Sequence, residues 1–306
     1  MTDALQSRRL VSTGWAFYQA GNSAGALRDF REALAINPED TEALCGAITC
    51  LVALKRLGEA NEAADRLLRL APNMARAHRT KGEVLRQSRK PRQAEGFFRI
   101  SIRLDPDDLL GYHFLGVTQY QRKRYRAALK TVREGRRLGP WHGVLAAQEA
   151  LILLHLKGPR AAGPLAEEAL RLSGDDDYVL TCVARVSLMQ GNRQKARDLL
   201  ETVLRRSANN EEAISLFLLT ERNRYGLLRA HVQFPYWRKD NGVFGWVVWI
   251  GAWVLLLAAL IVVALAGRVP AFFVALAYQL FWRVQYSGHR RRVRAHFAQT
   301  QLKPGF

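Results

Sequence analysis

Four prolines of this sequence recur at a constant spacing of 34 residues. They are Pro38, Pro72, Pro106 and Pro140, and Gly174 and Ala208 continue the phase without a proline. A constant internal period predicts a stack of similar supersecondary units, none of which buries a core alone. Each proline is expected to follow a helix and stop it. The acidic segments 37–40 and 105–108 are expected to cap the helix that comes next.

Small and large apolar residues keep the same register. In the first unit they are Leu10, Gly14, Phe17, Ala26, Phe30 and Ala33. The next three units repeat the pattern at Leu44, Leu51, Ala60 and Leu67, at Gly82, Leu85, Ala94 and Phe98, and at Tyr112, Leu115, Gly116 and Ala128. The pattern resembles the tetratricopeptide repeat (TPR) family, in which each unit is a pair of antiparallel helices. Phe17 and Phe30 are expected to fill the space between hairpins.

The resemblance implies an all-α fold: a right-handed TPR superhelix of about six helix-turn-helix repeats in residues 1–210, followed by one or two transmembrane helices. The last two repeats are degenerate. In the fifth, Pro159 and Pro164 are expected to delay or shorten the second helix, because proline is tolerated only in a first turn. A half-length helix from Glu211 to about Leu228 is expected to cover the last repeat, within a capping and juxtamembrane segment at residues 211–240.

Residues 243–266 run for 24 residues without a charge. As a helix they reach roughly 36 Å, against a hydrocarbon core of about 30 Å. A second, shorter apolar run at residues 269–286 is expected to be a second transmembrane helix or a re-entrant segment. Cations lie before the first run and after the second, and Arg268 alone lies between them. The positive-inside rule therefore favours a two-span hairpin over a single span.

Aromatic and basic residues beside the apolar runs suit the headgroup region of an anionic lipid membrane. These membrane-interface candidates are Trp237, Arg238, Lys239, Trp246, Arg283, Arg290, Arg291 and Arg292. The N-terminus lacks the basic and apolar pattern of a signal peptide. We therefore expect a bacterial-type inner (cytoplasmic) membrane protein, with both termini, the TPR array and a basic tail at residues 287–306 facing the cytoplasm.

The resemblance also implies that the first helix of each unit lines a concave groove. The candidate partner-binding residues on these helices are Arg8, Trp15, Tyr18, Arg76, Arg79, Arg86, His113, Tyr120, Tyr178 and Arg185. Arginines interleaved with aromatic rings suit an extended acidic peptide, through forked guanidinium contacts and stacking. Val11 and Trp15 stand where the family's carboxylate clamp has Lys and Asn, so binding of a chaperone's C-terminal tail is disfavoured.

Residue chemistry gives no sign of catalysis. The seven histidines fall at no metal-ligand spacing, and the three cysteines are too scattered for a zinc site. Phosphate-binding glycine loops are missing. The sequence therefore predicts a protein that is not an enzyme, with no catalytic residue, no metal, no cofactor and no evident small-molecule substrate.

The charge of the chain leaves two classes of macromolecular partner open. The net charge is +19, and residues 1–240 hold 39 basic against 27 acidic residues, or +12. The leading hypothesis is a membrane-anchored cytoplasmic TPR scaffold that binds a protein or peptide in its groove. One alternative is a helical repeat protein that binds nucleic acid, which the membrane attachment disfavours. Another is an accessory subunit of a membrane transport or envelope assembly complex.

Overall fold

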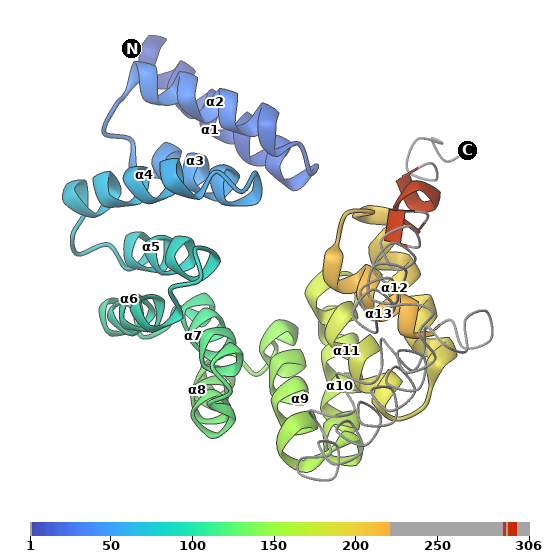
Figure 1. Ribbon diagram of the computed structural model, residues 1–306. Coiled ribbons are helices and arrows are strands. Elements are labelled where there is room, and N and C mark those ends of the chain that lie inside the picture. Colours follow the sequence, from blue (N-terminus) through green and yellow to red (C-terminus); the bar gives the residue numbers. More distant parts are fainter. Residues whose placement is uncertain (1, 221–289, 292, 299–306) are drawn as a thin grey trace, which may run out of the picture. The chain divides into compact units, whose positions relative to one another are not determined.

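The computed structural model describes residues 2–220, 290–291 and 293–298 (Figure 1). Within these residues the chain forms thirteen named α-helices and no β-strand. The helices are α1 (Thr2–Gln19), α2 (Ser23–Ile36), α3 (Thr41–Ala53), α4 (Leu57–Leu70), α5 (Ala75–Gln87), α6 (Pro91–Leu104), α7 (Leu109–Gln121), α8 (Tyr125–Leu138), α9 (Gly143–Lys157), α10 (Pro159–Leu172), α11 (Asp177–Met189), α12 (Arg193–Arg206) and α13 (Glu211–Thr220). The all-α repeat fold predicted from the sequence is confirmed for this part of the chain.

The helices follow the 34-residue register of the prolines. From α3 onward, each first helix of a pair begins 34 residues after the one before it, from Thr41 to Glu211. The second helices keep the same spacing from Ser23 to Arg193, and α2 ends two residues before Pro38. Two antiparallel helices therefore make one unit, as the sequence predicts.

The chain splits into two compact units, an N-terminal unit of residues 1–152 and a C-terminal unit of residues 153–306. Each core consists of apolar side chains between successive helices. In the N-terminal unit, Phe30, Ile48, Leu67 and Phe98 are fully buried. In the C-terminal unit, the fully buried large side chains include Leu200, Leu204 and Ile214.

Large and small residues face each other within the hairpins. The ring of Phe30 lies against Gly14 and against Gly46 of the next repeat, and the ring of Phe98 lies against Gly82. A larger residue at these glycines would meet the ring, so the glycines set how closely the helices approach. Gly46 does this in the second repeat, where Ile48 holds the glycine position of the family pattern.

Phe17 does not fill the space between hairpins, so that prediction is wrong. Its side chain is 39% exposed, whereas Phe30 is fully buried. Trp15 packs on Phe30 in its place, with the ring centroids 5.2 Å apart in an edge-to-face arrangement. Phe17 is therefore an exposed residue of α1, and Trp15 is the aromatic side chain of that helix that contacts Phe30.

The capping carboxylates are confirmed at one of the two predicted segments. Asp40 accepts hydrogen bonds from the backbone N–H groups of Glu42 and Ala43 at 2.9 and 3.0 Å, which caps α3. Asp108 holds the corresponding position before α7, but its side chain makes no capping bond. Its carboxylate pairs with Arg79 instead.

The fifth unit departs from the others at its turn and not in its second helix. Its first helix, α9, has 15 residues, while α3, α5, α7 and α11 have 13. The left-handed turn residue therefore moves to Gly158, with φ +83°. Pro159 then begins α10, and the helix continues through Pro164 to Leu172 with the same 14 residues as the other second helices. The predicted delay or shortening is wrong, because Ala162, Ala166 and Ala169 bury the face that holds the helix in place.

Helix α13 begins at Glu211, as predicted for the capping helix, and is described as far as Thr220. The terminal segment, defined here as residues 290–291 and 293–298, is helical and packs on α13. No helix in the described ranges is long and apolar enough to cross a membrane. The predicted membrane segments 243–266 and 269–286 lie outside the described residues, as do Trp237, Arg238, Lys239, Trp246, Arg283 and Arg292.

Candidate partner-binding surfaces

The first helices of the N-terminal repeats are joined by polar contacts at the predicted groove residues. The indole N–H of Trp15 on α1 donates to Oε1 of Glu42 on α3 at 2.9 Å. Arg76 on α5 pairs with the same carboxylate, and its guanidinium carbon lies 5.4 Å from the centroid of the Trp15 ring. Glu42 and Arg76 are therefore engaged with Trp15 across three successive first helices.

Three further predicted groove arginines, Arg79, Arg86 and Arg185, also have carboxylate partners. Arg79 pairs with Asp108, which links α5 to α7. Arg86 donates two hydrogen bonds to Glu83 on its own helix, at 2.6 and 2.7 Å. In the C-terminal unit, Arg185 on α11 pairs with Glu212 on α13. The positive charge predicted to attract an acidic peptide is thus balanced by internal ion pairs at these positions.

His113 is buried, contrary to the prediction that it is an exposed groove position. Its side chain is 9% exposed, and its Nδ1 lies 3.0 Å from Oε1 of Gln148 on α9. The Gln148 amide in turn donates to the backbone oxygen of His113 at 3.2 Å. Burial lowers the pKa of His113 from 6.5 to about 4. The register alone does not reveal this, because Gln148 comes from the next repeat.

The remaining predicted groove residues differ in exposure. Arg8 is exposed on α1, and Trp15, Tyr18, Tyr120 and Tyr178 are half-buried. Tyr120 packs edge to face against Tyr125 of α8, with the centroids 5.5 Å apart. Burial raises the pKa of the Tyr18 hydroxyl. Of the predicted groove residues, Trp15 and Tyr18 on α1 and Arg76 on α5 therefore lie on the first helices of the first and third repeats.

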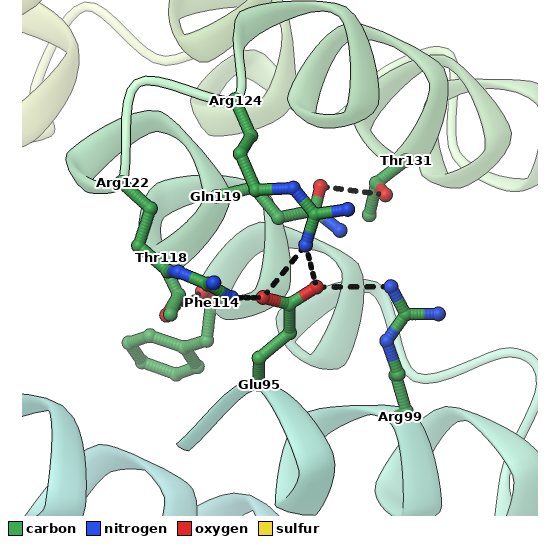
Figure 2. A network of polar contacts seen from close by, with 8 residues as sticks. All are labelled: Glu95, Arg99, Phe114, Thr118, Gln119, Arg122, Arg124 and Thr131. Atoms are coloured by element: carbon green, nitrogen blue, oxygen red, sulfur yellow. Dashed lines mark hydrogen bonds and ion pairs between the residues drawn. The ribbon is translucent and has the colours of Figure 1, made fainter. Parts of the chain in front are cut away.

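Three arginines converge on one carboxylate of a second helix, α6. Figure 2 shows Glu95 of α6 with Arg99, Arg122 and Arg124 around it; these four residues are named the Glu95 cluster. Arg99 donates to Glu95 at 2.9 Å, and one nitrogen of Arg124 reaches both carboxylate oxygens, at 2.9 and 3.2 Å. Arg122 completes the contacts. Three cations on one carboxylate leave a net charge of about +2.

Local sequence explains how the Glu95 cluster forms. Arg99 lies one helical turn after Glu95. Arg122 and Arg124 flank Lys123, whose φ of +59° turns the chain from α7 into α8. This left-handed residue aims both flanking guanidinium groups at the same carboxylate (Figure 2). The predicted groove lies on the first helices and does not include this cluster; its only trace in the sequence is the succession of three basic residues at 122–124.

Burial and ion pairing act in opposite directions on Glu95. The side chain is 6% exposed. Burial raises its pKa, but the hydrogen bond from Arg99 and the charges of Arg124 and Arg122 outweigh this, so the net pKa is lowered. Beside the cluster, Gln119 and Thr131 share a buried hydrogen bond of 3.0 Å (Figure 2). Glu95 therefore stays ionised and holds the arginines in place.

A hollow of about 410 Å³ adjoins the Glu95 cluster between α6, α7 and α8. Arg99, Arg103 and Lys130 supply cations to its wall, and Tyr112 supplies a hydroxyl. Glu134 is the one acidic residue of the lining. Together the cluster and the hollow form a surface, named the α6–α8 surface, on which positive charge exceeds negative charge. Such a surface can accept carboxylate or phosphate groups.

Metal-ligand groups and cysteine thiols can be assessed in the described residues. Among them, no group of three or more His, Cys, Asp or Glu side chains could hold a metal ion. All three cysteines are free and buried. Burial raises the pKa of Cys50 to about 11 and that of Cys182 to about 12, so these thiols stay protonated near neutral pH.

Comparison with known proteins agrees with the repeat geometry. Residues 17–84 match the family model described as tetratricopeptide repeat. A search of the curated proteins finds no match. Among solved structures, a chain of the APC/C hetero-tetramer Cut9–Hcn1 aligns with a TM-score of 0.57 at 20% identity, over 71% of this chain and 43% of that one. This chain thus spans less than half the length of that relative.

Two shorter proteins align along nearly their whole length. PilF of Pseudomonas aeruginosa has a TM-score of 0.52 at 18% identity, over 70% of this chain and 97% of PilF. PilW, described as a type IV pilus biogenesis factor, has a TM-score of 0.53 at 14% identity, over 68% of this chain and 96% of PilW. At these identities the likeness concerns the fold. The chain therefore has the fold of tetratricopeptide repeat proteins, and its residues 17–84 match the model of that family.

Proposed function

We propose that this protein is a membrane-anchored scaffold without catalytic activity, and that it binds an acidic segment of a partner protein. The observation that carries the proposal is the excess of positive charge on the α6–α8 surface. On the first helices, Arg76, Arg79 and Arg86 each have a carboxylate partner. On the α6–α8 surface, Glu95 is shared by three arginines, Arg103 adds further charge, and Lys130 lies 4.0 Å from Glu134, so five cations face two carboxylates. An acidic segment gains most where the cations outnumber the acids.

The likeness to TPR structures supports a binding role and leaves the partner open. Cut9–Hcn1 is described as a hetero-tetramer and PilW as a pilus biogenesis factor. For this chain we infer a role of the same general kind, as a scaffold within an assembly. The first-helix groove stays a predicted second contact, where Trp15, Tyr18 and Tyr120 offer aromatic surface to a peptide.

The membrane anchor in this proposal rests on the sequence. Residues 243–266 are long enough for a transmembrane helix, and residues 269–286 offer a second crossing or a re-entrant segment. The flanking cations favour the cytoplasmic side of an inner membrane for the array and for both termini. Anionic lipid would meet Arg238 and Lys239 at the membrane surface.

Charge reversal on the two surfaces tests where the partner binds. The full chain is purified in mild detergent, and the proteins that accompany it are quantified. The variant Arg103→Glu/Lys130→Glu should lose the captured partner, while the Glu95 cluster itself stays intact. The control Arg28→Glu/Arg69→Glu makes the same change in net charge at exposed positions on α2 and α4 and should keep the partner.

Three results would contradict parts of the proposal. Equal loss in both variants would mean that net charge alone governs capture. Unchanged capture in Arg103→Glu/Lys130→Glu, together with loss in Arg8→Glu/Arg76→Glu, would move the site to the first-helix groove. Capture that nuclease abolishes would favour the alternative of nucleic-acid binding.

A further inference from the structure

The terminal segment covers the apolar end of the repeat array. Val293 is 8% exposed and Phe297 is 4% exposed, and both belong to the same apolar cluster as Ile214 and Phe217 of α13. The rings of Phe217 and Phe297 meet edge to face, with 5.6 Å between centroids. On α12, the guanidinium carbon of Arg197 lies 5.4 Å from the Phe217 centroid. Phe217 is thus in contact with both α12 and the terminal segment.

Charged side chains hold the terminal segment at the start of α13. Arg290 and Arg294 both pair with Glu211, the first residue of that helix. Arg290 also lies 3.4 Å from the hydroxyl oxygen of Ser215. Negative charge at a helix N-terminus is favourable, so Glu211 is well placed to attract both arginines. Arg290, predicted to meet lipid headgroups, is thus engaged with Glu211, whereas Arg291 is exposed.

We propose that the terminal segment is the C-terminal cap of the array, and that residues 221–289 are an insertion whose two ends are both fixed to α13. A stack of helical hairpins needs a cover on its last apolar face. The sequence predicts one continuous helix from Glu211 to about Leu228 for this role. The structure brings Val293 and Phe297 to that face from about 70 residues farther along the chain.

The cap constrains how the insertion can cross a membrane, and this step rests on the proposed membrane anchor. One crossing carries the chain through a hydrocarbon core of about 30 Å. An odd number of crossings would place Arg290 on the opposite side from Glu211. Their contact therefore requires an even number, which the two apolar runs 243–266 and 269–286 supply as a hairpin. A membrane-anchored chain with an intact cap returns to the side on which the array lies.

Cross-linking of the full chain tests the cap. Glu211→Cys/Arg294→Cys gives up the ion pairs of Glu211 and keeps the apolar contacts of Val293 and Phe297, which the proposal requires to hold the cap. The variant is treated with a short bis-maleimide, and the three native cysteines are buried and do not compete. We expect an intramolecular cross-link in most chains. The control Glu211→Cys/Glu167→Cys places the second cysteine on α10, which α11 and α12 separate from α13, and should give little product. Equal yields in the two pairs would overturn the cap.

Labelling in sealed membrane vesicles tests the crossing number. Single cysteines at Glu211 and at Arg294 should react with an impermeant maleimide from the same side. Reaction from opposite sides would overturn the even crossing. The two failures are distinguishable: a chain that does not sediment with vesicles and still cross-links refutes the membrane anchor alone. A chain that sediments and shows no cross-link above the control refutes the cap.

Discussion

At the scale of single residues, His113 couples the stability of the N-terminal unit to pH. Burial lowers its pKa from 6.5 to about 4, and Gln148 binds the ring through Nδ1. The unfolded chain therefore binds a proton at a pH at which the folded chain does not. This contribution to the free energy of unfolding is fully present above pH 6.5 and is lost as the pH falls toward 4, where the loss reaches about 3 kcal/mol, at about 1.4 kcal/mol per pKa unit.

The substitution His113→Gln should remove this acid dependence. We expect the free energy of unfolding of the wild type to fall by about 2 kcal/mol more than that of the variant between pH 7 and pH 5. Urea titrations of both proteins across that range measure the difference. Parallel stability profiles would show that His113 takes up a proton without opening the structure.

Glu95 offers a second test at this scale. The substitution Glu95→Gln keeps the shape of the side chain and removes the charge that holds Arg99, Arg122 and Arg124. We expect a loss of about 1.5–3 kcal/mol in the free energy of unfolding, as for a buried hydrogen-bonded charge. The control Glu134→Gln removes an exposed ion pair in which the Glu134 carboxylate lies 4.0 Å from the Lys130 ammonium, and it should cost about 0.5 kcal/mol or less. Similar losses would mean that the Glu95 cluster is an ordinary surface network.

The sequence predicts residue positions in this fold better than it predicts their partners. The register places Arg76 and Arg79 on α5, but their partners come from the neighbouring repeats, Glu42 on α3 and Asp108 at the start of α7. The Glu95 cluster depends on a left-handed turn at Lys123, for which a non-glycine residue gives no clear signal. Pairings across repeats require side-chain geometry that periodicity does not contain.

At the scale of helices, glycines show where close approach matters. A Cβ at Gly82 would lie 2.6 Å from the buried ring of Phe98, whereas a Cβ at Gly96 would meet nothing within 4 Å. We expect Gly82→Ala to destabilise the protein by about 1–3 kcal/mol through overpacking. Gly96→Ala should stabilise it by up to about 1 kcal/mol, because alanine favours the helix.

Thermal unfolding of the two glycine variants measures both effects. The midpoint should fall for Gly82→Ala and rise for Gly96→Ala. A rise for both would mean that α5 and α6 can separate without loss of packing.

Helix boundaries are the part of this fold that the sequence predicts most fully. The proline register gives the starts of the first helices from Thr41 to Glu211 without error in phase. It misses the end of α9, which is two residues longer than α3, α5, α7 and α11 and moves the turn to Gly158, although α10 still begins in phase at Pro159. It also fails at the end of the array, since the cap comes from residues distant in sequence. A repeat pattern read along the sequence does not reveal a contact between residues that are far apart in the chain.

At the scale of the whole molecule, the binding surface, the cap and the predicted anchor lie in three separate parts of the chain. The N-terminal unit carries the α6–α8 surface, the C-terminal unit carries the cap, and the insertion between α13 and the terminal segment carries the predicted anchor. Both ends of the insertion adjoin α13 in this proposal, so substitutions within the insertion alter the anchor and leave the sequence of the array unchanged. The anchor can therefore be tested in the full chain.

Two arginines in the first apolar run should release the protein from membranes. Val254→Arg/Leu257→Arg places two charges near the centre of residues 243–266, each costing about 2.5–3.5 kcal/mol in insertion. We expect the wild type to stay in the membrane pellet after carbonate extraction and the variant to move to the supernatant. The control Leu54→Arg/Leu138→Arg adds the same charge at exposed array positions and should stay in the pellet. Extraction of the wild type by carbonate would refute the anchor.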